Sequence, residues 1–158
     1  AKAMAPDQAA KVMIFYFVGF TLGRLLSGIL ATRLSCWKII RMGMLVMGVA
    51  VLLLLLPLPG FTVVLALFLL GMGNSPLFPN FTYLTPQNFG ADISQSVIGA
   101  QMAASNTGFL AAPLLCGLLG QIFGMGVFPI YLAVLFVCLG FGVAHIQKTM
   151  KAAGKDTQ

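Results

Sequence analysis

Long apolar stretches alternate with short polar ones along the whole chain. A helix of about 20 apolar residues is long enough to cross the hydrocarbon core of a bilayer. Five segments meet this description, at residues 12–32, 39–57, 61–82, 95–120 and 127–147. The pattern predicts an all-α fold, a polytopic membrane bundle of five transmembrane helices that form a single membrane domain.

Short connections with turn-forming residues separate these segments. They read "PLPG" at 57–60, "TPQNFGAD" at 85–92 and "GQIFGMG" at 120–126. Charged residues make up 8% of the chain, whereas soluble domains carry about 25%. The polar start, "AKAMAPDQAAK", has neither an initiating methionine nor the pattern of a signal peptide. We therefore expect a membrane protein that is part of a longer chain.

The basic residues predict an orientation in the bilayer. Six of them flank the first connection or follow the fifth segment: Arg33, Lys38, Arg41, Lys148, Lys151 and Lys155. Five spans put these two groups on one side, and Lys2 and Lys11 on the other. Because cytoplasmic loops are enriched in Lys and Arg, the C-terminus should be cytoplasmic and the N-terminus outside. The nine basic residues are too dispersed for a nucleic-acid partner.

The spans differ in polarity. From Met42 the second segment has no polar side chain, and the fifth has almost none before His145, so both can face lipid. Polar residues occur in the first, third and fourth segments instead. Since polar side chains inside a bilayer usually face protein or a water-filled cavity, these three segments should line the interior.

Three polar residues of the interior segments lie at a similar depth. Arg24 precedes Arg33 by nine residues, or about 13 Å of helix, which places it near the middle of the membrane. Asn74 and Asn106 lie about midway along their own segments. Secondary transporters bind substrate at this depth, so the three are candidates for a substrate pathway. Alternatively, Arg24 snorkels or pairs structurally, and the amides are packing contacts between helices.

Three further residues are weaker candidates for the same pathway. Gln101 should lie about 7 Å closer to the cytoplasm than Asn106. Tyr16 and Asn80 complete the set, although Tyr16 also suits the aromatic belt of a membrane interface.

Prolines predict interruptions of two segments. Pro76 and Pro79 lack an amide proton, which frees the carbonyls of Met72 and Ser75. Pro113 does the same in the fourth segment. A broken helix in a membrane is usually buried against protein or lines a cavity, whereas a simple kink is the commoner outcome of a proline.

Small residues recur every fourth position in the first segment, at Gly19, Gly23, Ser27 and Ala31. Such a stripe lets a second helix approach closely, and therefore predicts a packed bundle.

The inventory of reactive side chains argues against an enzyme. The acids are Asp7, Asp92 and Asp156, none of them within a predicted span, and the one histidine is His145. Neither a catalytic pair, a triad nor a metal cluster can be assembled from them, so we expect no cofactor and no metal. The three cysteines are far apart and suit buried apolar positions.

Two stretches resemble the major facilitator superfamily of transporters. "GRLLSGILATRLSCWKIIRMG", at 23–43, is similar to the family's cytoplasmic-loop motif, with Gly28, Arg33, Lys38 and Arg41 at plausible motif positions. Thr32 stands where the stronger form has aspartate, which is typical of the second copy. "SPLFPNFTYLTPQNFG" and "GAQMAASNTGFLAAPLLCGLLG" resemble helices ten and eleven, with some similarity to the fucose-permease-like sugar transporters.

The resemblance implies a C-terminal half, helices eight to twelve, of a twelve-helix transporter in a bacterial inner (plasma) membrane. Its partners would be the lipid bilayer, a missing N-terminal bundle and a small polar solute, with a coupled proton or sodium ion. A competing register, helices two to six, lacks the arginine usual in helix four. A different hypothesis is a non-transporting membrane subunit or scaffold whose polar residues only pack helices.

Overall fold

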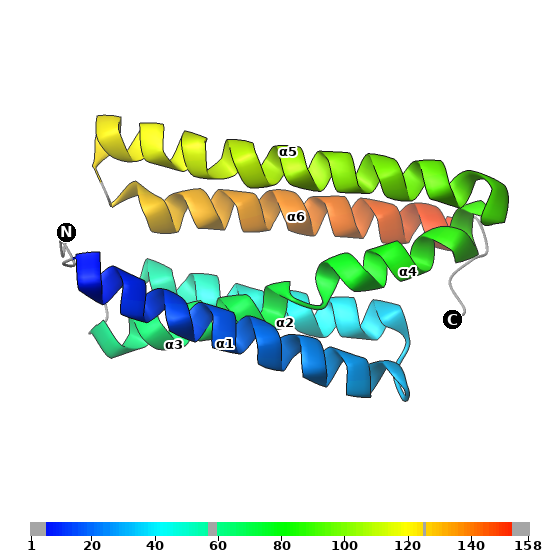
Figure 1. Cartoon of the computed structure of the whole chain (residues 1–158), viewed down its shortest axis with the longest axis horizontal. Helices are drawn as coiled ribbons and strands as arrows, with labels where there is room; N and C mark the ends of the chain where they lie inside the picture. Colours follow the sequence, from blue (N-terminus) through cyan, green and yellow to red (C-terminus); the bar gives the residue numbers. More distant parts are fainter. Residues whose placement is uncertain (1–5, 57–59, 125, 153–158) are drawn as a thin grey trace.

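The structure is a bundle of α-helices (Figure 1). The computed structural model describes residues 6–56, 60–124 and 126–152. The helices of these residues are α1 (Pro6–Ala31), α2 (Cys36–Leu55), α3 (Gly60–Asn74), α4 (Leu77–Phe89), α5 (Ala91–Phe123) and α6 (Val127–Ala152). The described residues contain no strand, and the predicted all-α class is confirmed.

Five stretches of the described residues are long and apolar enough to cross a membrane. They are Met13–Ala31, Cys36–Leu55, Phe61–Asn88, Asp92–Phe123 and Val127–Met150. The third stretch consists of α3 and α4 in succession. The five predicted membrane helices are therefore present, with the third divided in two.

Two of the predicted connections are shorter than expected. Residues 85–92 were expected to form a loop, yet α4 continues to Phe89 and the chain turns at Gly90, whose φ is 82°. The helix α5 likewise continues to Phe123 and ends at Gly124, also with φ 82°. At Gly90 a single glycine with positive φ connects the two helices, because no Cβ opposes that conformation. Most of the predicted 57–60 turn lies outside the described residues.

The first helix also begins earlier than predicted. The first membrane segment was predicted to begin at residue 12, but α1 begins at Pro6. Proline suits the first position of a helix, since its fixed φ is helical and its missing amide proton has no partner there in any case.

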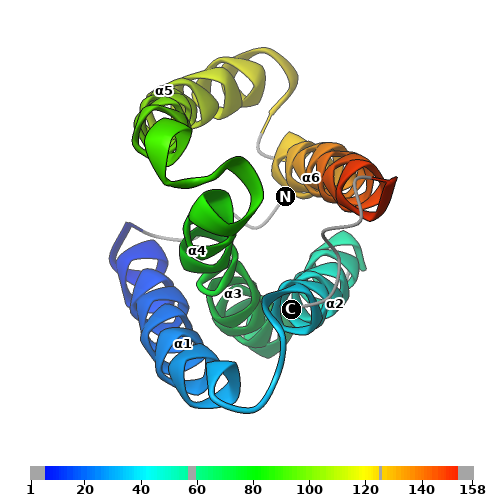
Figure 2. The same ribbon diagram turned by 90° about the vertical axis from the view of Figure 1, so that its right-hand side faces the viewer.

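The helices α3 and α4 occupy the middle of the bundle (Figure 2). The helix α3 packs against α1 and α2, while α4 packs against α2 and α5. The helices α5 and α6 run side by side, and α6 also packs against α2. The break in the third span is therefore flanked by α1 and α2.

Glycines bring α1 and α3 into backbone contact. A Cβ on Gly19 would collide with the carbonyl of Phe68, and one on Gly23 with the carbonyl of Met72. From the other side, a Cβ on Gly71 would meet the backbone of Tyr16. The predicted small-residue stripe is confirmed as a packing surface at its two glycines.

A second glycine contact joins α3 to α2. A Cβ on Gly43 would lie 2.7 Å from the Gly73 carbonyl oxygen, and one on Gly73 would lie 2.6 Å from the Gly43 carbonyl oxygen. The last two turns of α3 are thus held between α1 and α2, with Gly71 facing one neighbour and Gly73 the other.

The helix α2 is more enclosed than its apolar composition predicts. One face carries buried residues, including Trp37, Ile40 and Ala50, and the opposite face exposes Leu45 and Leu52. Only the exposed face fits the expectation that this span faces lipid. Burial of α2 needs no polar side chain, because its contacts are made by glycine and apolar residues.

The buried apolar core lies between α2, α4 and α6. Its members are Trp37, Ile40, Leu77, Leu84 and Val143. Phe81 packs beside them, and its ring lies edge-on to that of Trp37 with the ring centroids 6.4 Å apart. This core holds α4 in place below the break in the third span.

Candidate functional site at the break in the third span

The third span is broken between Asn74 and Leu77. Ser75 and Pro76 separate the last residue of α3 from the first residue of α4. Pro76 therefore lies at a break in the helix, and not at the simple kink that was the commoner expectation for a proline. Pro79 causes no second interruption, because it lies in the first turn of α4, where amide groups have no partner within the helix.

Pro113 has a different outcome from Pro76. It lies inside α5, which is one continuous helix from Ala91 to Phe123. The helix break predicted at Pro113 is absent. A proline within a membrane helix is tolerated when neighbouring groups or local adjustments satisfy the freed carbonyl.

Asn80 stabilises the break from below. Its side-chain nitrogen Nδ2 donates to the Pro76 carbonyl oxygen at 2.6 Å, and its backbone amide donates to the same oxygen at 3.3 Å. Nδ2 also lies 3.4 Å from the Ser27 hydroxyl of α1. The Asn80 side chain is only 6% exposed. The structure thus places this predicted pathway residue in a buried position that braces the break.

Other polar groups at the break are shielded by helix packing. The Met72 carbonyl, which Pro76 deprives of its helical donor, lies against Gly23 of α1. The Ser75 hydroxyl is buried and has no hydrogen-bond partner among the described residues. Helix α1 therefore covers the freed carbonyl, as expected for an interrupted membrane helix.

Tyr16 and Asn74 meet beside the break. The Asn74 side-chain nitrogen donates to the Tyr16 hydroxyl oxygen at 3.3 Å, which links α3 to α1. Asn74 remains exposed. The two predicted pathway residues are therefore neighbours, with polar atoms at the surface of the bundle.

Arg24 is exposed on α1 and lies next to an aromatic ring. Its guanidinium carbon is 5.6 Å from the centroid of the Phe20 ring, one helical turn earlier. A cation over an aromatic face is stabilised by the quadrupole of the ring. Within the described residues no carboxylate forms an ion pair with Arg24, so its charge is available to a further partner.

Asn106 is separated from the other two residues of the predicted midplane group. It is exposed on α5, which packs against α4 and α6, and no hydrogen bond among the described residues joins it to α1 or α3. The structure thus brings Tyr16 and Asn74 together and leaves Asn106 on a more peripheral helix.

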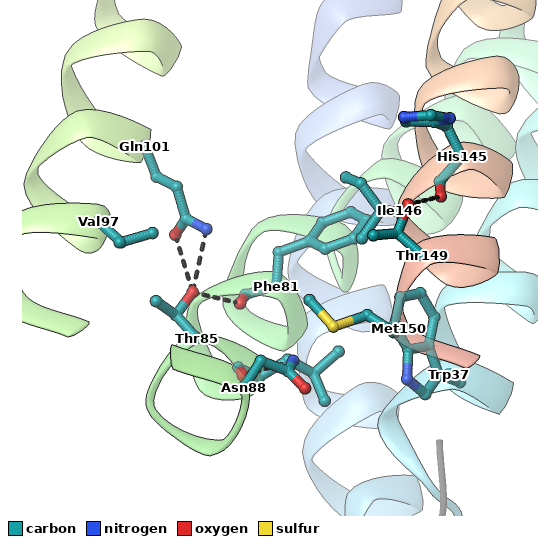
Figure 3. A pocket seen from close by; sticks show the side chains of 11 residues that line it. Trp37, Phe81, Thr85, Asn88, Val97, Gln101, His145, Ile146, Thr149 and Met150 are labelled. Carbon is teal, nitrogen blue, oxygen red and sulfur yellow. Dashed lines mark hydrogen bonds between the residues drawn. The ribbon is translucent and has the colours of Figure 1, made fainter. Parts of the chain in front are cut away.

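Gln101 belongs to a second polar group, nearer the end of the bundle. Its side-chain nitrogen donates to the Thr85 hydroxyl oxygen at 3.0 Å, and that hydroxyl lies 3.0 Å from the Phe81 carbonyl oxygen. These bonds connect α5 to α4 and form one wall of a pocket of about 350 Å³ (Figure 3).

The pocket lies between α4, α5 and α6, with Trp37 of α2 at its base. Its apolar lining consists of Trp37, Phe81, Leu84, Val97, Ile146 and Met150. Its polar lining consists of Thr85, Asn88, Gln101, His145 and Thr149. Gln101 is the one predicted site residue among them.

Thr85 and Asn88 were missed because their segment was predicted to be a loop. Phe81, Leu84, Thr85 and Asn88 occupy positions i, i+3, i+4 and i+7, which share one face of α4. That spacing is the pattern of a helical face, and it was the signal available in the sequence.

The basic motif forms a turn at one end of the bundle. The chain leaves α1 at Ala31 and enters α2 at Cys36, and the Arg33 amide donates to the Leu30 carbonyl at 2.9 Å. The side chains of Arg33, Lys38 and Arg41 are exposed, and Gly28 has open space around it. We call this the basic end of the bundle.

These features define a polytopic membrane protein with an interrupted central span. Comparison with family models matches residues 2–155 to the Major Facilitator Superfamily. The match covers nearly the whole chain, and the chain belongs to that family. Comparisons with curated proteins and with solved structures gave no match. Membership implies membrane transport of small solutes in general, and family members are transporters rather than enzymes.

Proposed function

We propose that the chain is part of a secondary transporter that moves a small polar solute by alternating access. The observation that carries this proposal is the break in the third span, where Asn74 of α3 contacts Tyr16 of α1. Discontinuous helices near the middle of the membrane form the substrate and ion sites of many transporters. The match to a transporter family supports the same conclusion.

The proposed pathway runs along the polar residues of α1, α3 and α5. Tyr16, Arg24, Asn74 and Asn106 contact the solute, and Asn80 positions the break from its buried place. Gln101 instead holds α5 to α4 through Thr85. Amides and a hydroxyl suit a hydroxyl-rich solute such as a sugar, whereas Arg24 suits an organic anion. As a permease or symporter, the transporter would couple to a proton or sodium ion through groups outside these helices.

The chain supplies helices eight to twelve of a twelve-helix protein in this proposal. The basic end faces the cytoplasm of a bacterial inner membrane, and a separate N-terminal bundle forms the opposite wall of the pathway. Similarity to the fucose-permease-like branch favours sugars as the first solutes to test.

Solute uptake by cells that express the complete reading frame tests the proposal. The cells are screened with labelled sugars and organic anions, and uptake of the transported solute is then measured in variants. We expect Asn74→Ala to reduce uptake about fivefold or more, because a polar group of the substrate that loses its hydrogen-bond partner costs about 1–3 kcal/mol. Gln121→Ala, an exposed amide at the far end of α5, is the matched control.

Two results would contradict the proposal. One is uptake that is unchanged in Asn74→Ala and Asn106→Ala, which would remove the assigned pathway. The other is uptake by liposomes that hold only these 158 residues, which would remove the need for a second bundle.

A further inference from the structure

The pocket near the basic end has the size and composition of a small-molecule site. Its volume of about 350 Å³ lies within the range of about 300–1,000 Å³ found for ligand pockets. Three separate helices supply its walls, with α5 on one side, α6 on the other and α4 between them (Figure 3). Such pockets are usually apolar, with a few polar groups that fix the orientation of the ligand.

Gln101 is the polar group with unused hydrogen-bonding capacity. An amide side chain has two N–H donors and a carbonyl oxygen with two lone pairs. Thr85 accepts one of these protons and directs its own hydroxyl proton to the Phe81 carbonyl, at 3.0 Å. The Gln101 carbonyl oxygen also lies 3.3 Å from the Thr85 hydroxyl oxygen. The second amide proton and one lone pair of this carbonyl oxygen are therefore left for a ligand.

The rest of the lining is largely apolar. Among the lining residues that the structure describes there is no aspartate, glutamate, lysine or arginine, so a charged ligand would lose hydration without gaining a carboxylate, ammonium or guanidinium counter-ion from them. Trp37, Phe81 and Met150 instead offer an aromatic and apolar surface to the body of a ligand.

We propose that this pocket binds a small neutral amphipathic molecule, with an apolar or aromatic body and one alcohol or amide group that hydrogen-bonds to Gln101. The site is separate from the break in the third span. Its failure would leave the transport proposal standing, because that proposal depends on Asn74, which does not line the pocket.

The chain contains a built-in reporter for this site. Trp37 is its single tryptophan and lies at the base of the pocket, so all indole fluorescence originates there. The probe is 4-bromobenzyl alcohol, whose bromine quenches indole fluorescence on contact. The chain is reconstituted in lipid nanodiscs and titrated with this probe and with 4-bromotoluene, which lacks the hydroxyl group.

We expect saturable quenching of Trp37 by the alcohol and weaker binding of 4-bromotoluene. Gln101→Leu should raise the Kd of the alcohol about fivefold, as one lost hydrogen bond does, and should leave the Kd of 4-bromotoluene nearly unchanged. The matched control is Gln95→Leu, an exposed amide of the same helix that does not line the pocket. It should bind both probes as the unmodified chain does.

A second variant covers the case in which Gln101→Leu does not fold. Val97→Phe keeps the polar network and fills part of the pocket, so saturable quenching should be lost.

Three results would overturn the proposal. The first is quenching that rises without saturation in every variant, which would show simple partition into lipid. The second is an equal effect of Gln101→Leu and Gln95→Leu. The third is equal Kd values for the two probes in the unmodified chain, which would indicate an apolar niche for a lipid chain.

Discussion

The burial of α2 and α5 is the reverse of what their polarity predicts: the apolar helix α2 is partly enclosed, and the more polar helix α5 is exposed. From Met42 onward α2 has no polar side chain, yet one of its faces is buried against α1, α3, α4 and α6. The membrane-spanning part of α5 carries Ser105, Asn106 and Thr107, yet Ser94 is its one buried residue among those whose burial the structure describes. Polarity therefore does not rank the helices of this chain by enclosure.

Small residues explain better than polarity which helices are enclosed. The contacts of α3 with α1 and α2 are made at glycines, where the backbones touch, and this gives close packing without a hydrophobic force between apolar helices. By contrast, side-chain bonds join α5 to its neighbours, as when the Tyr131 hydroxyl of α6 donates to the Ala112 carbonyl at 2.9 Å. Stability should accordingly depend on glycines where α3 meets α1 and α2, and on single hydrogen bonds where α5 meets its neighbours.

The largest expected effect comes from a methyl group at the α1–α3 contact. Gly23→Ala should lower the free energy of unfolding by about 3 kcal/mol, since a Cβ there collides with the Met72 backbone and forces the helices apart. Unfolding in mixed micelles, followed by circular dichroism, measures the change. Gly108→Ala is the matched control on α5, because the added Cβ would meet no described atom of another helix within 4 Å. A loss of equal size in the control would remove the contrast between the two regions.

The second-largest effect on the free energy of unfolding is expected at Asn80, which stabilises the break in the third span. Asn80→Ala should cost about 2 kcal/mol in the same assay, because the buried Pro76 carbonyl loses its side-chain donor. Asn106→Ala removes an exposed amide of α5 and should cost nothing measurable. If Asn80→Ala is as harmless as Asn106→Ala, the break does not depend on this bond.

A smaller effect is expected where α4 meets α5. Thr85→Val keeps the volume nearly constant but removes the partner of Gln101, at a cost of about 1 kcal/mol. Thr82→Val is the control, since its hydroxyl bonds only within its own helix, to the Phe78 carbonyl at 3.0 Å. The distribution of distances between spin labels on α4 and α5 should broaden in Thr85→Val and stay narrow in Thr82→Val. Equal distributions in the two variants would show that other contacts hold α5.

The smallest expected effect is at the link between α1 and α3. Tyr16→Phe deletes one hydroxyl and its bond to Asn74, which should cost about 0.6 kcal/mol, the mean for a bond between membrane helices. Tyr83→Phe is the matched control at an exposed ring. A cost above that of Asn80→Ala would mean that the polar link, rather than the glycine contact, joins these helices.

The fold was largely predictable because apolar segments of membrane length have few alternative structures. The stripe at Gly19 and Gly23 also predicted the packing face of α1. Thr85 and Asn88 were misassigned because Pro86 and Gly90 resemble a loop when read together, although proline is tolerated in this helix and only Gly90 turns the chain. The difference between Pro76 and Pro113 depends on the surrounding helices, which no local pattern records.

The candidate site was predictable only in part. Helical rise placed Arg24, Asn74 and Asn106 at one depth, but depth does not specify which way a side chain faces or which helices are neighbours. In the structure Asn74 hydrogen-bonds to Tyr16, whose aromatic side chain is long enough to reach from α1 to α3. The pocket required four helices to be placed relative to one another, and the sequence contains no short motif for that arrangement.

The glycine contacts of α3 also have a consequence for the order of events during synthesis. All of them join α1, α2 and α3, which are consecutive along the chain. Proteins are made from the N-terminus at about 5–20 residues per second, and units that are local in sequence can assemble before the rest has emerged. The first three helices can therefore pack together before α5 and α6 have emerged from the ribosome. The ribosome would then deliver α4 to a partly built bundle whose broken end is already covered.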